Sequence, residues 1–280
     1  MSVAESDMSL LRTQLQQACA GDGEPLDIAG VALLLAALRR PGIDLEPYRQ
    51  HLAAIVAAVA DLVRRRGATL DTLRQVVAAS YGYRGDTEAY DDLQNADFVR
   101  VIDRRKGLPV ALSILYMHVA RAQGWECVGL AFPGHFLIRL ECEGSRFVLD
   151  PFYGGIVREP NDMRQLLKSV SGADAELSPR HFEAVGDRDV LLRLENNTKS
   201  RLLQRGDTSG ALEALGRMLL VAPDRAELLF EQGMLHAGLD HTRAALQALE
   251  RFMSVTESES NNPARYRASQ AIQSLKRKMN

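Results

Sequence analysis

Residues 104–155, RRKGLPVALSILYMHVARAQGWECVGLAFPGHFLIRLECEGSRFVLDPFYGG, contain the change of hydrophobic period that decides the fold. The tripeptide Gly-Leu-Pro at 107–109 opens a helix, because proline's fixed φ suits a first helical turn and its missing N–H is not needed there. We expect this helix to run to Gln123 and to stop at Gly124. After Gly124 the apolar segments are short and rich in Val, Ile, Leu and Phe, which predicts strands.

Three antiparallel strands are expected after this helix, at residues 126–132, 135–141 and 146–150, separated by turn residues at Pro133-Gly134 and at 143–145. His135 stands at the expected start of the second strand and Asp150 at the end of the third. Antiparallel neighbours can bring two such side chains together. A carboxylate that orients an imidazole is the geometry of a nucleophilic active site.

The chain before this block is expected to be helical. Apolar residues recur at helical spacing over residues 28–38. Asp44 is expected to cap the next helix, with Pro47 in its first turn. Further along, we expect helices near residues 70–80 and 96–105, with an ordered loop at 80–95 between them. A helical part joined to a small antiparallel sheet predicts an α+β fold.

The C-terminal third contains an internal repeat. Residues 211–217, ALEALGR, are echoed by residues 245–251, ALQALER, at an offset of 34 residues. Small alanines at a 34-residue period, with Pro223 after the first copy, are the signature of tetratricopeptide repeats. The tail at 263–278 has helical apolar spacing and is expected to cap the repeats internally. The predicted division is a helical or flexible segment at 1–26, a mixed core at 27–184 and an all-α repeat region at 185–280.

The central block resembles the transglutaminase-like superfamily, whose papain-like core carries a Cys-His-Asp triad. Gly107 corresponds to the motif glycine, His135 to the histidine, and Asp150 with Pro151 to the Asp-Pro pair. The position of the nucleophilic cysteine falls on Pro109. As a whole, the chain is similar to the bacterial SirB-type family, in which such a core precedes tetratricopeptide helices. That resemblance implies a regulatory protein with no settled reaction, in a family whose nucleophile position is typically not cysteine.

The replacement at position 109 removes the attacking group. Proline has no nucleophile, acid or donor, and the nearest hydroxyl on the same helix face is Ser113, which we expect to be buried. Cys127 lies beyond the helix end and Cys142 near the far end of a strand, so neither is placed as a substitute. The remnant pair is therefore His135 and Asp150. The candidates for a ligand-binding cleft are Ser113, Gly134, His135, Asp150 and Phe152.

The composition excludes several classes of protein. The chain has 280 residues, and its 34 basic and 36 acidic side chains give a formal charge of -2, which argues against a nucleic-acid-binding or membrane-surface protein. Three cysteines are too few for a disulfide framework, and only His135 and Asp150 converge, which predicts neither a metal nor another cofactor. The longest apolar run, residues 28–38, is shorter than the roughly 20 residues of a membrane span. The N-terminus lacks the pattern of a signal peptide, so we predict a cytoplasmic protein.

Two functions from different classes follow. The first is a non-catalytic regulatory or scaffold protein whose repeats bind a partner protein or peptide. The alternative is a hydrolase or acyl-transfer-type enzyme in which His135, oriented by Asp150, acts as general base without the usual cysteine. A third, weaker option is a cysteine enzyme that uses Cys127. The sequence leaves the partner and the oligomeric state open.

Overall fold

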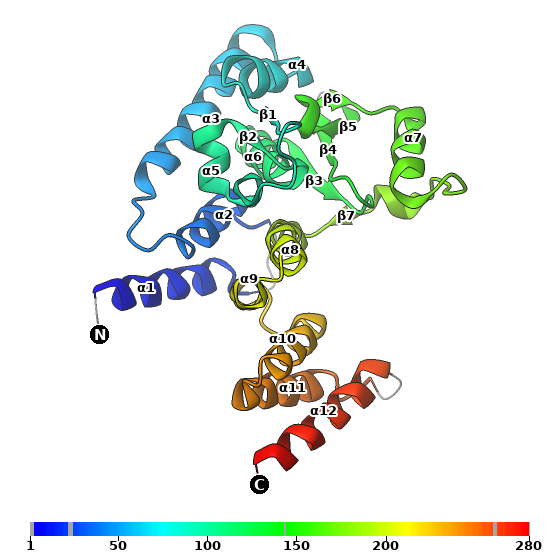
Figure 1. Ribbon diagram of the computed structural model, residues 1–280. Coiled ribbons are helices and arrows are strands. Elements are labelled where there is room, and N and C mark those ends of the chain that lie inside the picture. The colour runs from blue at the N-terminus through cyan, green and yellow to red at the C-terminus, as the bar shows by residue number, and fades with distance from the viewer. Residues whose placement is uncertain (1–2, 22–24, 143, 260–261, 280) are drawn as a thin grey trace. The chain divides into compact units, whose positions relative to one another are not determined.

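The chain folds into two compact units, Met1–Leu194 and Glu195–Asn280 (Figure 1). The computed structural model describes residues 3–21, 25–142, 144–259 and 262–279. The division between the units falls inside helix α8 (Asp187–Gln204), whereas the sequence pattern placed the start of the repeat region at residue 185. None of the helices among the described residues is both long and apolar enough to cross a bilayer.

The first unit begins with three helices: α1 (Val3–Ala18), α2 (Ile28–Ala37) and α3 (Glu46–Arg66). Helix α2 is buried along nearly its whole length. The expected cap at the start of α3 is wrong by one residue, because the N-cap is Leu45 and Asp44 instead accepts a hydrogen bond of 2.9 Å from the Glu46 amide. The predicted N-terminal segment at 1–26 contains α1, and its residues 1–2 and 22–24 lie outside the described residues.

The next segments are more varied than the predicted pair of helices. Helix α4 (Leu70–Arg74) continues into a π-helical turn, Gln75–Ser80. The loop expected at 80–95 contains the two-residue strand β1 (Arg84–Gly85), which pairs in parallel with β2 (Lys106–Gly107). Between them lie a 3-10 turn, Leu93–Ala96, and helix α5 (Phe98–Arg104). The parallel pair joins two segments that are far apart in sequence, and no local pattern predicted it.

A five-stranded antiparallel sheet follows, in the order β6-β5-β4-β3-β7. Its strands are β3 (Glu126–Leu130), β4 (Ile138–Cys142), β5 (Ser145–Asp150), β6 (Ile156–Val157) and β7 (Ala184–Val185). The three central strands were expected, and the two edge strands were missed because two residues show no periodicity. One expected placement is wrong: His135 precedes β4 and lies in the connection from β3, not at the start of a strand.

Helices cover both faces of this sheet. Helix α6 (Pro109–Arg121) packs against β3 and β4, and α2, α3 and α5 contact α6 in turn (Figure 1). Helix α7 (Pro160–Ser171) forms a second apolar cluster with the opposite face. Side chains alternate along a strand, so the β3–β4 register places Leu130 and Leu137 on the α7 side. The predicted α+β fold class is confirmed.

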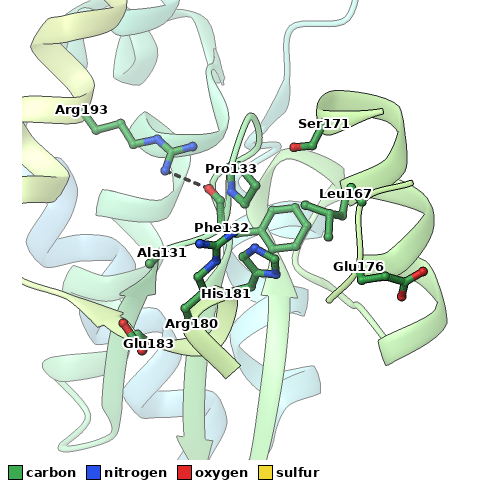
Figure 2. Close-up of a pocket in the computed structure, with 11 residues that line it drawn as sticks. Ala131, Phe132, Pro133, Leu167, Ser171, Glu176, Arg180, His181, Glu183 and Arg193 are labelled. Atoms are coloured by element: carbon green, nitrogen blue, oxygen red, sulfur yellow. Dashed lines mark hydrogen bonds between the residues drawn. The ribbon is translucent and has the colours of Figure 1, made fainter. Parts of the chain in front are cut away.

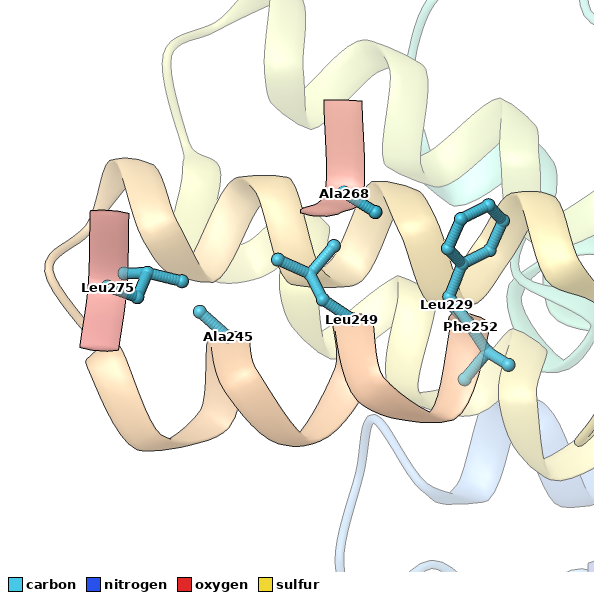
Figure 3. Close-up of a cluster of buried hydrophobic side chains, with 6 residues drawn as sticks. All are labelled: Leu229, Ala245, Leu249, Phe252, Ala268 and Leu275. Atoms are coloured by element: carbon cyan, nitrogen blue, oxygen red, sulfur yellow. The ribbon is translucent and has the colours of Figure 1, made fainter. Parts of the chain in front are cut away.

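The second unit is helical and contains α9 (Thr208–Val221), α10 (Ala226–Gly238), α11 (Thr242–Val255) and α12 (Pro263–Met279). The two repeated segments, residues 211–217 and 245–251, are the middle parts of α9 and α11, and α12 is the helix expected as a cap. Figure 3 shows the shared core of α10, α11 and α12. Its buried residues are Leu229, Ala245, Leu249, Phe252, Ala268 and Leu275. Each hairpin therefore buries its apolar face on the next, as repeat proteins require.

Candidate functional site

His135 and Asp150 meet at one end of the sheet. His135 follows a tight turn in which Gly134 adopts a left-handed φ of +71° and the His135 amide donates to the Pro133 carbonyl at 2.8 Å. Asp150 is the last residue of β5. The His135 Nε2 atom lies 2.9 Å from Asp150 Oδ1. The side chain of His135 is 11% exposed and that of Asp150 is fully buried.

The Asp150 carboxylate is held by three groups. Besides His135, the Phe152 amide donates to Oδ1 at 3.1 Å, and the Arg158 guanidinium donates to Oδ2 from Nε at 3.0 Å and from Nη2 at 2.7 Å. Charge-assisted hydrogen bonds of this kind are among the strongest in proteins. Asp150 therefore ties β5 to the turn that follows it and to Arg158 beside β6, in addition to orienting His135.

The His135 ring is packed among aromatic side chains. Phe152 lies edge-on at a centroid distance of 6.0 Å, and Tyr153 stacks on it at 6.3 Å. Tyr153 is 52% exposed and carries the Arg158 guanidinium 5.1 Å from its ring centre. The Nδ1 atom of His135 makes no hydrogen bond to any described residue. That nitrogen is the ring atom left to hydrogen-bond a further group.

Pro109, which the resemblance places at the nucleophile position, is the first residue of α6. Pro109 is buried there, and Ser113 one turn later is fully buried with no hydrogen-bond partner for its Oγ atom. Gly85 on β1 pairs with Gly107 on β2, just before the start of α6. A Cβ atom added at Gly85 would lie 2.5 Å from the Phe152 ring, so only glycine permits this approach. The turn after Asp150 is thereby held near the start of α6.

The cysteines do not replace the nucleophile. Cys127 on β3 and Cys142 at the end of β4 are both buried. Burial raises the pKa of the Cys127 thiol to about 12, so it carries almost no thiolate at neutral pH. Across the described part of the chain, no group of three or more His, Cys, Asp and Glu side chains is placed to hold a metal ion.

The structure thus brings together four of the five cleft candidates, Gly134, His135, Asp150 and Phe152. The fifth, Ser113, is fully buried on α6. Sequence reasoning missed Arg158 and Tyr153. Tyr153 lies within residues 104–155 quoted above, but only its stacking on His135 in the structure shows that it belongs to the site. Arg158 follows β6, a strand too short to predict, and the β5–β6 hairpin carries it back to Asp150.

A hollow of about 420 Å³ lies beside this site. Phe152, Tyr153 and Gly154 form one wall, and residues around β1 and β2 form the rest. Tyr90 packs edge-on against Phe152 at 5.7 Å and is 40% exposed, as an aromatic rim to the same region. The site is therefore an aromatic surface next to a half-buried histidine.

Comparison with known proteins identifies the first unit. A model described as the transglutaminase-like superfamily matches residues 46–196, which is more than half of the 280 residues. The chain belongs to the transglutaminase-like superfamily. Within this superfamily, the chain adds a second domain, because a tetratricopeptide-repeat model matches residues 198–273. The repeat assignment made from the 34-residue offset is confirmed.

Curated relatives share both parts of this transglutaminase-like chain. A UPF0162 protein of Xylella fastidiosa (strain Temecula1) is 28% identical over 248 residues, covering 86% of this chain and 88% of the relative. A UPF0162 protein of Vibrio cholerae is 29% identical over 250 residues, covering 88% and 91%. Protein SirB1 of Salmonella typhimurium is 24% identical over 187 residues, covering 65% and 69%. The resemblance to the SirB-type family is confirmed.

Proposed function

We propose that this protein is a non-catalytic member of its superfamily that binds a partner protein or peptide through its helical repeats. The observation that carries the proposal is Pro109, buried at the first position of α6 where the superfamily places its nucleophile. An acyl-transfer reaction needs an attacking group at that point, and proline supplies none. Ser113 and Cys127 are buried, so neither offers a substitute.

The bonding of Asp150 supports the same function. A buried carboxylate that accepts from further donors besides the imidazole links the segments that carry those donors. Here Asp150 also holds Arg158 and the Phe152 amide, and it is completely buried. We infer that the remnant pair now serves to hold the end of the sheet, and that its side chains were retained for that structural role.

The second unit supports the proposal that the protein binds a partner protein or peptide. Tetratricopeptide repeats generally mediate protein–protein interaction, because stacked hairpins leave one extended surface open. In this unit α12 exposes Tyr266 to 69% and Met279 to 53%, although both are large apolar residues. Large side chains of this kind anchor protein interfaces when they become buried. We infer a protein or peptide as partner.

The competing function is a hydrolase that uses His135 as general base on water. The free Nδ1 atom of His135 and the 11% exposure of its side chain are what favour it. To decide, the purified protein is incubated with p-nitrophenyl acetate and with a glutamine donor plus dansylcadaverine. His135→Ala is compared with His241→Ala, which replaces an exposed histidine of the second unit. Our proposal expects no acyl-enzyme and equal rates in all three proteins. Turnover that disappears only in the folded His135→Ala protein would establish the hydrolase instead.

Partner binding is tested in the cells from which the chain derives. A photo-cross-linking amino acid replaces Tyr266 in the full-length chain, and a control chain carries it at Asp71, which is 88% exposed on α4. We expect one discrete adduct from position 266, none from position 71, and an unchanged adduct when His135→Ala is added. The same amino acid is placed at Met279 in a further chain. If neither position 266 nor position 279 yields an adduct, the repeats do not bind as proposed.

A further inference from the structure

A second cavity lies between the β3–β4 connection, α7 and the 3-10 turn Pro179–Phe182. Its volume is about 580 Å³, within the range of small-molecule sites. Figure 2 shows the residues that line it. They are Ala131, Phe132, Pro133, Leu167, Ser171, Ala175, Glu176, Arg180, His181, Glu183 and Arg193. The floor is apolar, and nitrogen-bearing side chains lie around it.

His181 is a hydrogen-bond donor toward this cavity. Its ring is 5% exposed and packs edge-on against Phe132 at 6.0 Å. The Ser178 amide lies 3.1 Å from the His181 Nδ1 atom. A backbone N–H can only donate, so Nδ1 carries no proton and the neutral ring holds its proton on Nε2. Nε2 has no hydrogen bond to any described residue. It therefore offers a donor and not the lone pair that a metal ion needs.

Two guanidinium groups lie on the same side of Phe132. Arg193 is fixed in place, since its Nη1 atom donates to the Phe132 carbonyl at 3.0 Å and its guanidinium lies 5.0 Å from the centre of the Phe136 ring. Burial lowers the pKa of Arg193, which marks a cation that water solvates poorly. Arg180 is exposed, and within the described residues its guanidinium has neither an ion pair nor a hydrogen bond.

Within the described residues, neither carboxylate of the lining forms an ion pair with Arg180. Glu176 is 77% exposed and lies 3.9 Å from Lys168, outside the cavity lining. Glu183 is exposed as well. In Figure 2 the two carboxylates lie at opposite ends of the lined surface, whereas Arg180, His181 and Arg193 gather around Phe132 and Pro133. The centre of the cavity is therefore rich in donors and positive charge.

We propose that this cavity binds a small organic anion. The oxyanion accepts hydrogen bonds from His181 Nε2 and from the Arg180 guanidinium, and the apolar part of the ligand packs against Phe132 and Leu167. Charge-assisted hydrogen bonds to arginine suit both carboxylate and phosphate oxygens. This proposal is independent of the absence of catalysis and of the partner of the repeats.

The probes are benzoate, phenyl phosphate and the neutral phenol, each titrated into the full-length protein and followed by saturation-transfer NMR. We expect benzoate or phenyl phosphate to bind with a dissociation constant on the order of 1 mM, as few contacts allow for a fragment of this size. Phenol should not saturate in the same range. The stronger of the two anions identifies the oxyanion class, carboxylate or phosphate.

Arg180→Gln and His181→Gln should each weaken the anion roughly tenfold, which is the effect of losing one charge-assisted or buried donor. Arg164→Gln is the matched control, because Arg164 is an exposed arginine on α7 outside the lining. Arg180→Gln removes an exposed side chain, so it tests the site even if His181→Gln unfolds. The proposal fails if neither anion binds at 20-fold the expected constant (about 20 mM), if phenol binds equally well, or if Arg164→Gln weakens binding as much as Arg180→Gln.

Discussion

Asp150 is the residue of this site with the largest number of bonded partners. Its carboxylate is completely buried and bonded to His135, Arg158 and the Phe152 amide. A buried charge is tolerated only when its partners replace water. Removing one partner leaves the others unpaired. The pair of His135 and Asp150 therefore contributes to stability whether or not it takes part in a reaction.

Asp150→Asn should therefore lower the free energy of unfolding by about 3 kcal/mol, because it leaves the Arg158 cation partly buried without its counter-charge. Urea unfolding followed by circular dichroism measures the change. The matched control is Asp224→Asn, which breaks an ion pair of 2.9 Å with Arg251 in which Asp224 is 74% exposed. Exposed pairs contribute little, so the control should remain near the parent protein. Equal losses in both variants would contradict the structural role of Asp150.

His118 on α6 predicts a pH dependence of stability. Burial lowers its pKa from the ordinary value, and Asp27, whose Oδ1 atom lies 3.9 Å from Nδ1, opposes this only in part. The unfolded chain then binds more protons than the folded one between the folded pKa and the unfolded value of about 6.5. The stabilising effect of neutral His118 is complete above about pH 6.5 and is lost as the pH falls below it.

The check is His118→Gln, compared with His241→Gln at an exposed position. Between pH 7 and pH 5, we expect the free energy of unfolding of the parent to fall more steeply than that of His118→Gln, while His241→Gln follows the parent. Identical slopes in the parent and in His118→Gln would show that His118 is protonated as readily in the folded state as in the unfolded one.

At the scale of elements, the crossing of α10 and α11 depends on one missing side chain. A Cβ atom at Gly233 would lie 2.5 Å from Cγ and 2.7 Å from Cδ2 of Leu249. This glycine is buried on α10, and its neighbour Leu249 belongs to the core in Figure 3. The close approach of the two helices explains why a helix interior retains a residue of poor helix propensity.

Gly233→Ala should destabilise the second unit by roughly 2 kcal/mol, since the methyl group overpacks the crossing. Gly216→Ala is a control in α9, where no heavy atom lies within 4 Å of the added Cβ. There the better helix propensity of alanine should be neutral or stabilising by up to about 1 kcal/mol. Thermal unfolding of the full chain gives both values. A stabilised Gly233→Ala protein would rule out the tight crossing.

The elements also show which local patterns were sufficient. Helices α2 and α6 and strands β3, β4 and β5 begin within a few residues of their predicted positions, since each carries enough apolar residues to show its period. Strands β1, β2, β6 and β7 have two residues each and are held only by their partners. The same limit applies to His135, which the β3–β4 turn, and not a strand, places against Asp150.

For the whole molecule, the three cysteines report on global opening. Cys19 follows α1, Cys127 lies on β3 and Cys142 ends β4; all three are buried, and none forms a disulfide within the described residues. Burial raises the pKa of the Cys19 and Cys127 thiols, so both their access and their reactivity are low.

We expect none of the three thiols to react with 5,5′-dithiobis(2-nitrobenzoate) in the native protein over minutes, and all three to react in 6 M guanidinium chloride, a concentration that unfolds ordinary domains. The absorbance of the released thiolate counts them. The variant Cys127→Ser shows whether Cys127 is the thiol that reacts most slowly. One thiol that reacts at once in the native protein would show that part of the first unit is open to solvent.

The sequence by itself determined the fold class and the repeat region, because these depend on local periods and a 34-residue offset, and it placed proline at position 109. Only the tertiary structure decided what surrounds the remnant pair. Arg158, Tyr153 and Gly85 reach the site from β6, a turn and β1, and the cavity around His181 joins α7 to the turn before β7. Contacts between segments distant in sequence follow from packing and pairing, and no local pattern of residues records them.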